Sequence, residues 1–316
     1  MSPGCQYVRK VPGLPARPAD AHKGCFGRVL VLGGSVGMVG APSLVGQAAL
    51  RSGAGLVTIA VPESIQSAAS TLCPCATTIR LPETASGQID AGKALRLFKD
   101  RGLLEPPPGG APPDVLVAGP GVGLGSAEYG RGLWKLIDAF RVEVAVPAVI
   151  DADALNAAGS AGQRASVCWA RRRHFRTVIT PHPGELARMH GVTTRQIQAD
   201  RQGFAVRTAR QMRHRDDGPH DTAVVVLKGA GTVVTDGRRV YRNRTGNPGM
   251  ATGGSGDVLA GVIAGLIGQG MSCFDAAVAG VYRHGLAGDL AARRYGQVPL
   301  IATDIIDALP EAFLSQ

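Results

Sequence analysis

The stretch RVLVLGGSVGMVGAPSLVGQAALRSGAGLVTIAV (28–61) decides the fold. It opens on a continuous apolar run that ends in Gly33-Gly34, which is typical of a strand buried on both faces, as in a parallel sheet. Residues 41–53 then carry apolar side chains at helical spacing, with Pro42 suited to the first turn and Gly53 to the helix end. A second apolar run, 56–61, predicts the next strand.

The same alternation of strand, loop and helix recurs along the chain. Further strands are expected at the starts of VLVAGPGVG (115–123), VPAVIDADALN (146–156), RTVITPHPGEL (176–186) and AVVVLKGAGT (223–232). Helical stretches are expected near 127–140, 185–190 and 194–213, and residues 255–314 are expected to be nearly all helix. This pattern predicts an α/β fold with a doubly wound, mostly parallel sheet flanked by helices. Segment 232–243 differs, because Asp236-Gly237 between two β-rich runs predicts a hairpin.

The domain organisation is predicted to be simple. Residues 1–22 are polar and contain four prolines, so we expect an N-terminal arm that is partly ordered at best. Residues 23–316 are expected to form a single domain, and the Pro- and Gly-rich stretch 106–113 is interpreted as a surface loop inside it.

Composition excludes several classes of protein. Hydrophobic residues make up 45% of the 316 residues, which is too many for a disordered chain, yet no apolar run is long enough to span a membrane. The six cysteines form no C-x-x-C pair and no signal peptide is recognised, so we expect idle thiols in a reducing compartment and a cytoplasmic protein.

The chain is strongly basic, with a formal net charge of +10. Such a charge suits nucleic acid, an acidic membrane surface or an anionic small molecule. Few aromatic residues lie among the arginines, so no stacking platform for bases is expected, and neither nucleic acid nor a membrane is predicted as a partner. A positive electrostatic field that attracts anionic ligands would explain part of the net charge. The sequence offers no explanation for the rest.

Chemically distinctive residues follow the predicted strands. They are Gly33-Gly34, Gly119–Gly123, Asp151 with Asp153, His182 with Glu185, and Lys228-Gly229. Ligands of open parallel sheets bind outside the carboxyl ends of the strands, so together these residues predict one site. Each also has a structural interpretation: Asp153 as a helix N-cap, His182 as a turn residue, Lys228 as a solvated lysine.

The most informative segment is NRTGNPGMATGGSGDVLAGVIAGLIGQG (243–270). Gly253, Gly254 and Gly256 precede an apolar helix, which presents bare backbone amides where the helix dipole favours an anion. Asp257 either supports the helix start or acts as a base that takes a proton from a hydroxyl attacking a phosphoryl group.

The sequence GSGD (254–257) resembles the signature of ribokinase-like small-molecule kinases, and a wider set of motifs narrows the resemblance. Taken together they resemble the NAD(P)H-hydrate dehydratase family, in its stand-alone form, over residues 20–315. The motifs are residues 27–57, AGPGVG (118–123), VIDADALN (149–156), ITPHPGE (179–185), VLKGAGT (226–232) and NPGMATGGSGDVLAG (247–261).

This resemblance implies a ribokinase-like fold and a lyase that repairs the S epimer of hydrated NADH or NADPH. ADP, or ATP, phosphorylates the ring hydroxyl, and elimination of phosphate restores NAD(P)H, leaving AMP when ADP is the donor. Mg²⁺ is the implied cofactor. A cytoplasmic homotetramer acting with a separate NAD(P)H-hydrate epimerase is implied as well.

The resemblance also implies roles for individual residues. Asp257 matches the family's base and substrate contact, and Glu185 is a weak candidate for a magnesium contact made through water. Substrate positions match at Ala41, Gly123 and His182, with Gly121 and Asn156 expected beside them. Nucleotide contacts are implied for Lys228, Gly229, Ala230, Gly231, Thr232, Gly254 and Gly256.

Three other functions remain open at this stage. A ribokinase-like kinase of a small alcohol or vitamin precursor would use the same anion cradle. A non-catalytic binding protein would use only the basic surface. A hydrolase would use Ser35, Asp151 and His182, but a nucleophile elbow needs a helix that begins at the serine, and here Gly37 and Gly40 delay the helix to Pro42.

Overall fold

The structure is a computed structural model that describes residues 4–105, 112–160, 176–213 and 223–315. Within these ranges one sheet contains the strands β1 (Gln6–Val8), β2 (Arg28–Leu32), β3 (Leu56–Pro62), β4 (Thr77–Leu81), β5 (Val115–Ala118), β6 (Ala148–Ile150), β7 (Thr177–Ile179), β8 (Ala223–Leu227), β9 (Val233–Thr235) and β10 (Arg239–Arg242). Their spatial order is β1-β10-β9-β8-β7-β6-β5-β2-β3-β4. Every neighbouring pair is parallel except the two that involve β9.

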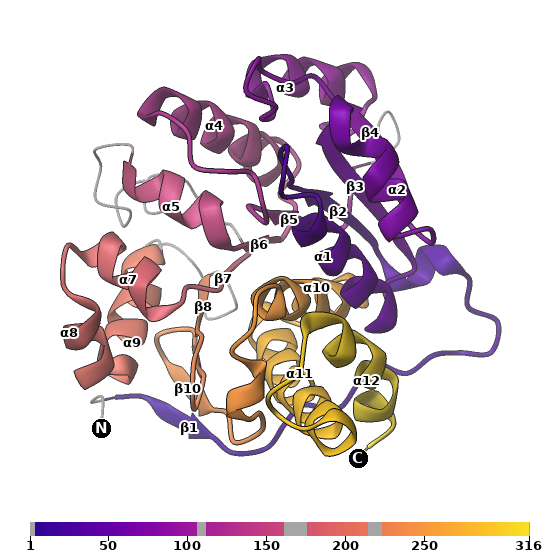
Figure 1. Cartoon of the computed structure of the whole chain (residues 1–316). Helices are drawn as coiled ribbons and strands as arrows, with labels where there is room; N and C mark the ends of the chain where they lie inside the picture. The colour runs from indigo at the N-terminus through magenta and orange to yellow at the C-terminus, as the bar shows by residue number, and fades with distance from the viewer. Residues whose placement is uncertain (1–3, 106–111, 161–175, 214–222, 316) are drawn as a thin grey trace.

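Helices cover both faces of this sheet (Figure 1). One face carries α1 (Gly40–Arg51), α2 (Gln66–Leu72), α10 (Ser255–Gly268), α11 (Cys273–Tyr295) and α12 (Ala302–Leu314). The other carries α3 (Ala91–Asp100), α4 (Ala127–Glu143), α5 (Ala152–Ser160), α7 (Pro183–His190) and α9 (Arg201–Met212), with α8 (Thr194–Ala199) beside α7 and α9. The predicted α/β class, with a doubly wound, mostly parallel sheet, is confirmed.

The two faces explain why the central strands are apolar throughout. Successive side chains of a strand point to opposite faces, so Val29 and Val31 pack in one core while Leu30 and Leu32 pack in the other. Each of these four residues is at most 3% exposed. A strand with helices on both sides therefore needs a continuous apolar run, which is the pattern that the sequence shows at 28–32.

Several predicted elements are confirmed, among them the hairpin of β9 and β10, the strands at 115–118 and 223–227, and the helical region from Ser255 to Leu314. The prediction missed α2, β4 and α3, whose segments 66–100 are more polar than the central strands. It also missed β1, which lies within residues 1–22 and pairs in parallel with β10. The predicted surface loop 106–113 lies partly outside the described residues. Cys168, one of the six cysteines expected to be idle thiols, lies wholly outside them.

No helix in the described ranges combines the length and the apolar character that crossing a membrane requires.

Candidate functional site

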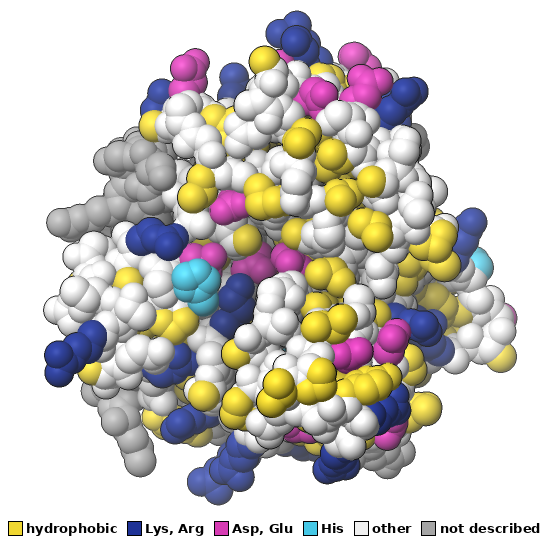
Figure 2. Space-filling view, viewed as in Figure 1, with side chains coloured by type: hydrophobic (Ala, Val, Ile, Leu, Met, Phe, Trp, Pro, Cys, Tyr) yellow, Lys and Arg dark blue, Asp and Glu magenta, His cyan; other side chains and the backbone are white. Residues whose placement is uncertain are grey.

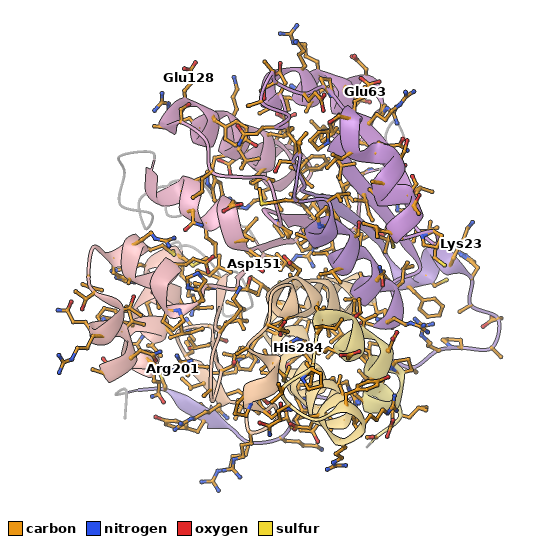
Figure 3. All side chains as sticks on the ribbon, in the orientation of Figure 1. Lys23, Glu63, Glu128, Asp151, Arg201 and His284 are labelled. Carbon is orange, nitrogen blue, oxygen red and sulfur yellow. The ribbon has the colours of Figure 1, made fainter. Side chains whose placement is uncertain are left out.

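The site lies at the carboxyl ends of β6, β7 and β8, which are parallel neighbours and so end at the same edge. Asp151 directly follows β6 and Lys228 directly follows β8. Asp151 Oδ1 accepts a hydrogen bond from Lys228 Nζ at 2.7 Å, and the Asp151 residue is only 1% exposed. Figure 3 shows Asp151 near the centre of the molecule, where the ends of these strands meet α5 and α10.

The backbone around Asp151 is held in an unusual conformation. Ala152 has a φ of 50°, a region that non-glycine residues rarely adopt. Gly119, at the end of β5, has a φ of 118°, and a Cβ there would lie 1.9 Å from the carbonyl oxygen of Asp151. The chain can therefore reach this position only because residue 119 has no side chain, and the strain lies at the site itself.

Lys228 is surrounded by carboxylates. Burial lowers the pKa of its ammonium, but the charges of Asp151, Glu185 and Asp257 outweigh burial and raise the pKa above its ordinary value. Lys228 therefore stays charged at neutral pH. A partly buried, positively charged ammonium at the strand ends is suited to binding a phosphate.

His182 and Glu185 form the start of α7. His182 Nδ1 accepts hydrogen bonds from the amides of Gly184 (3.0 Å) and Glu185 (3.3 Å), while Glu185 Oε2 accepts the His182 amide at 2.7 Å. This capping box fixes the histidine ring with Nε2 3.5 Å from Glu185 Oε1. Burial raises the pKa of the Glu185 carboxyl to about 7, with Lys228 opposing the shift.

The first turn of α10 faces the same charges. Gly254, the N-cap, has a φ of 87°, and no side chain caps the helix, so its first amides stay available to an anion. Asp257 lies in this turn. Burial raises the pKa of its carboxyl to about 7, the charges of Asp151 and Asp153 add to the shift, and the Lys228 ammonium opposes it.

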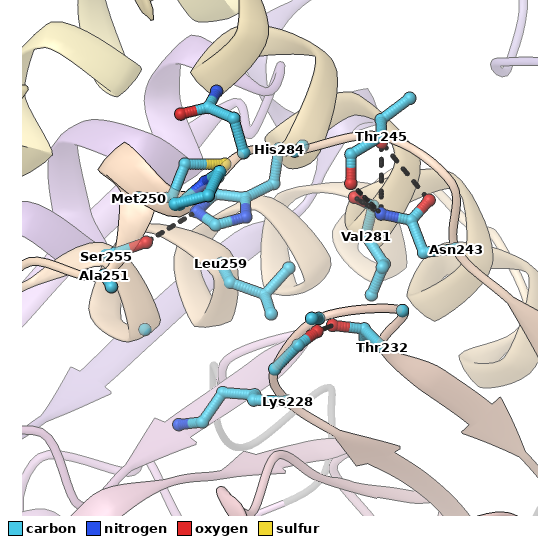
Figure 4. Close-up of a pocket in the computed structure, with 18 of the residues that line it drawn as sticks. Lys228, Thr232, Asn243, Thr245, Met250, Ala251, Ser255, Leu259, Val281 and His284 are labelled. Carbon is cyan, nitrogen blue, oxygen red and sulfur yellow. Dashed lines mark hydrogen bonds between the residues drawn. The ribbon is translucent and has the colours of Figure 1, made fainter. Parts of the chain in front are cut away.

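A cavity of about 750 Å³ adjoins these residues. Lys228 lies at one end, His284 and Met250 lie at the other, and Leu259 lies between them (Figure 4). Acidic, basic and histidine side chains gather around a hollow in the middle of the face seen in Figure 2. Of the residues predicted for the site, this cavity is lined by His182, Lys228, Gly229, Ala230, Gly231, Thr232 and Gly256.

The other predicted residues occupy the adjacent side of the site. A Cβ on Gly121 would lie 3.1 Å from the Cβ of Ala41, so these two positions adjoin each other. The Gly123 amide donates to Asp153 Oδ2 at 3.0 Å, and Asn156 Nδ2 donates to Asp153 Oδ1 at 3.4 Å. This group reaches Asp257 through Asp153, whose charge contributes to the raised pKa of the Asp257 carboxyl.

Asn156 and Gly254 have clear structural contacts. Asn156 Oδ1 accepts a hydrogen bond from Arg188, which ties α5 to α7. A Cβ on Gly254 would lie 2.6 Å from Leu44 Cδ1 and 3.0 Å from Ala302 Cβ, so this glycine lets α10 pack between α1 and α12. Neither residue lines the cavity of about 750 Å³.

The structure argues against the hydrolase alternative, because Ser35 is not placed to act as a nucleophile. Ser35 is 4% exposed, and its Oγ donates to the carbonyl oxygen of Gly121 at 2.8 Å. The following helix begins only at Gly40. Ser35 thus stabilises the glycine loop after β5 and does not present a hydroxyl to a substrate.

Sequence reasoning missed one contact and one residue of the site. Asp151 was expected among the residues that follow the strands, and as the acid of the hydrolase alternative, but its pairing with Lys228 was not predicted. From the sequence alone His284, in the helical region 255–314, is expected to be a core or surface histidine; it is buried, but it also lines the cavity, with Nε2 3.4 Å from Ser255 Oγ. Burial lowers the pKa of His284 to about 4 and keeps it neutral. Only the position of α11 against α10 could have placed it there.

The donor set fits a magnesium ion that is held chiefly by phosphates. Within the described ranges, no three His, Cys, Asp or Glu side chains are grouped so that they could ligate a metal ion. Glu185 already accepts a backbone amide and lies against His182. Mg²⁺ usually keeps several waters and takes one or two carboxylates besides substrate phosphates, which suits a contact from Glu185 through water.

Comparison with known proteins identifies a family for this fold and site. A family model described as NAD(P)H-hydrate dehydratase matches residues 29–311. The bifunctional NAD(P)H-hydrate repair enzyme Nnr of Moorella thermoacetica is 45% identical over 299 residues, which cover 94% of this chain and 51% of that protein. The chain thus spans about half the length of such bifunctional relatives.

Shorter relatives match nearly end to end. The ADP-dependent (S)-NAD(P)H-hydrate dehydratase of Neisseria meningitidis is 36% identical over 93% of this chain and 87% of that protein. The ADP/ATP-dependent NAD(P)H-hydrate dehydratase of Bacillus subtilis, co-crystallised with ATP and Mg²⁺, superposes with a TM-score of 0.75 at 29% identity, covering 96% of this chain and 94% of that one. The predicted ribokinase-like fold is confirmed by such structural neighbours. The match along the whole domain shows that the chain belongs to the NAD(P)H-hydrate dehydratase family.

Proposed function

We propose that this chain dehydrates the S epimer of hydrated NADH or NADPH, using ADP, or ATP, to activate the ring hydroxyl. The observation that carries the proposal is Asp257, a base with a pKa of about 7 that lies beside the amides of the α10 start and the Lys228 ammonium. The family membership supports the substrate and the reaction.

Several groups of the site are expected to bind the nucleotide and its phosphates. The Lys228 ammonium and the amides at Gly254–Gly256 hold the transferring phosphoryl group, since both favour negative charge. The loop Lys228–Thr232 lines the cavity in which the rest of the nucleotide lies. Mg²⁺, arriving with the phosphates and reached by Glu185 through water, would neutralise their charge.

Asp257 then takes the proton of the ring hydroxyl. The hydroxyl oxygen forms a bond to the terminal phosphorus, the bond from that phosphorus to the bridging oxygen breaks, and AMP leaves when ADP is the donor. Phosphate next leaves with the electron pair of the carbon–oxygen bond, the neighbouring ring carbon loses a proton, and the dihydropyridine is restored. Hydroxide is a poor leaving group and phosphate a good one, which is why a nucleotide is consumed.

The hydrated ring is expected on the side of Asp257 that carries Ala41, Gly121, Gly123 and His182. A glycine at 121 and one at 123 leave room against Met38, since added Cβ atoms would lie 2.7 Å from its carbonyl oxygen and 3.3 Å from its Cε, respectively. We therefore expect nucleotide and substrate on two sides of the Asp257 carboxylate, with His182, which also lines the nucleotide cavity, between them.

The test is a direct assay. Hydrated NADPH with ADP, and separately with ATP, should regain the ultraviolet absorbance of reduced nicotinamide when the purified protein is added. Folded protein that is silent with both nucleotides would overturn the proposal. A stable phosphorylated product instead of elimination would point to a kinase of a small alcohol, which is the second candidate.

We also propose that the protein is a homo-oligomer, a tetramer by family resemblance, that acts downstream of an NAD(P)H-hydrate epimerase. Support comes from an exposed apolar group where α11 ends and α12 begins: Tyr295 and Ile301 are both 53% exposed and Val298 is 99% exposed. Light scattering on the wild type and on Val298→Asp tests the assembly; a monomeric wild type contradicts it.

A further inference from the structure

A second cavity, of about 910 Å³, adjoins the nucleotide cavity. The two share Gly231, Asn243 and Arg244, so they lie on either side of the same strip of chain. The walls of the second cavity come from β1 and the residues after it, from β10 and from α11. None of the proposed catalytic groups lines it.

The composition of this cavity is unusual for this chain. The protein has five tyrosines, and three of them, Tyr7, Tyr241 and Tyr282, line the cavity. Arg9, Arg242 and Arg244 line it as well, and no Asp or Glu is among its lining residues. Segments that are 230 or more residues apart in sequence therefore bring aromatic rings and guanidinium groups together.

The three arginines have no counter-charge in the described part of the chain. Arg9, Arg242 and Arg244 are exposed, and none forms an ion pair with a described carboxylate. The pKa of Arg201 is lowered mainly by burial and further by the nearby charge of Arg242. Several cations therefore lie close together here. The crowding accounts for part of the +10 net charge that the reaction itself does not require.

Two of the three tyrosines form hydrogen bonds through their hydroxyls with other side chains. Tyr7 Oη accepts a hydrogen bond from Gln202 Nε2 at 2.7 Å, and Tyr241 Oη donates to Asn243 Oδ1 at 3.2 Å. Both rings are thereby held in place; Tyr241 is only 5% exposed and packs in the core, whereas Tyr7 remains 45% exposed and open to a ligand. Fixed aromatic rings beside guanidinium groups favour a ligand that has both a flat ring and a strongly negative part.

We propose that this cavity is a second ligand site that takes a nucleoside diphosphate or triphosphate, with the base against the exposed ring of Tyr7 and the phosphates against the arginines. The volume lies within the range of about 300–1,000 Å³ that small-molecule sites occupy, which favours a single nucleotide over a polymer. Binding here does not depend on the proposed dehydratase reaction, and it adds a site to that of the reaction.

Isothermal titration calorimetry with ADP on the full-length protein tests this inference. The wild type should bind two ADP per chain. Lys228→Met should lose the first site and keep the second. The double variant Tyr7→Ala with Arg9→Glu should keep the first site and bind at the second at least about tenfold more weakly, since a hydrogen bond to a charged group and a ring contact are lost.

The matched control is Lys10→Glu, which makes the same change of charge next to Arg9 on a residue that does not line the cavity. It should leave both sites unchanged. A single ADP site in the wild type up to millimolar ligand, or equal weakening by the double variant and by Lys10→Glu, overturns the proposal. Displacement of the second ADP by a short single-stranded RNA at lower concentration also overturns it, in favour of a polymer. If the protein shows no dehydratase activity but still binds ADP at the second site, only the proposed function is rejected.

Discussion

Two carboxylates at the same edge of the sheet differ in whether a cation is hydrogen-bonded to them. Asp151, at the end of β6, is 1% exposed and accepts a 2.7 Å hydrogen bond from Lys228. Asp257, in the first turn of α10, has no side-chain partner among the hydrogen bonds of the described chain, and burial raises its pKa to about 7. One charge is compensated and the other is not.

The difference shows how the fold separates structural and reactive acids. The end of β6 supplies an anion that keeps Lys228 charged and in place. The start of α10 supplies an acid whose proton affinity matches neutral pH, which is what general-base catalysis requires. Both roles depend on the same Lys228, which binds Asp151 directly and only opposes the shift at Asp257.

The largest effect is expected from Asp257→Ala. Loss of a general base should lower kcat about a thousandfold and leave the Kd of ADP unchanged. Turnover and ADP titration together measure this. Asp275→Ala, the same change in the first turn of α11, is the control and should retain full activity. If Asp257→Ala still converts substrate at the wild-type rate, Asp257 is not the reactive acid and the two carboxylates do not differ in role.

Replacing Asp151 should mainly lower the free energy of unfolding. Asp151→Leu leaves the partly buried Lys228 without its partner and should cost about 3 kcal/mol in the free energy of unfolding. Urea denaturation measures the loss. The double variant Asp151→Leu with Lys228→Met should recover most of it, because no charge is then left unpaired. Equal destabilisation in the single and double variants would argue against the pair.

Gly256→Ala tests the space between the two acids. The new Cβ would lie 3.2 Å from Lys228 Nζ and 3.8 Å from Asp151 Oδ2. We expect the KM of the nucleotide to rise about ten- to hundredfold, because the methyl group displaces the ammonium from the phosphate. Gly268→Ala, at the far end of the same helix with ordinary contacts of 3.5 Å or more, should leave KM unchanged.

The pH dependence of turnover should follow Asp257. Because its pKa is about 7, kcat should fall about tenfold for each pH unit below that value as the base becomes protonated. Steady-state rates from pH 5 to pH 9, a range of about four units around that pKa, measure the profile. A rate that stays level down to pH 5 would show that Asp257 is not the titrating base.

The smallest effect concerns stability. The pKa of Asp257 is 3.8 in its ordinary state and about 7 when folded, so the folded protein binds the proton more tightly and loses stability as pH rises between these values. Asp257→Asn should therefore raise Tm at pH 8 and give no comparable gain near pH 4. Calorimetry at both pH values checks the sign; Asp275→Asn should show no comparable pH-dependent gain.

Much of the fold could be predicted, because the central strands are buried on both faces and therefore carry unbroken apolar runs. The region 66–100 could not, since α2, β4 and α3 lie near the edge of the sheet and their solvent-facing residues dilute the pattern. β1 was missed for a related reason: three edge residues among prolines become a strand only because β10 offers them a partner.

The candidate site was predictable where a local motif carries the chemistry, as in GSGD at 254–257 and the segment Lys228–Thr232. It was not predictable where contacts are made across the sheet. Nothing near Asp151 in sequence indicates Lys228, which lies 77 residues away. His284 reaches the cavity only through the packing of α11 on α10.

The sequence by itself determined the alternation of strands and helices, the glycine turns at the strand ends and the acid at the start of α10, because these depend on side-chain pattern and backbone freedom within a few residues. Only the tertiary structure decided which acid is paired and which stands alone, and it alone gathered three tyrosines and three arginines around one cavity. Charge compensation and burial depend on distances between remote segments, and those distances are set by packing.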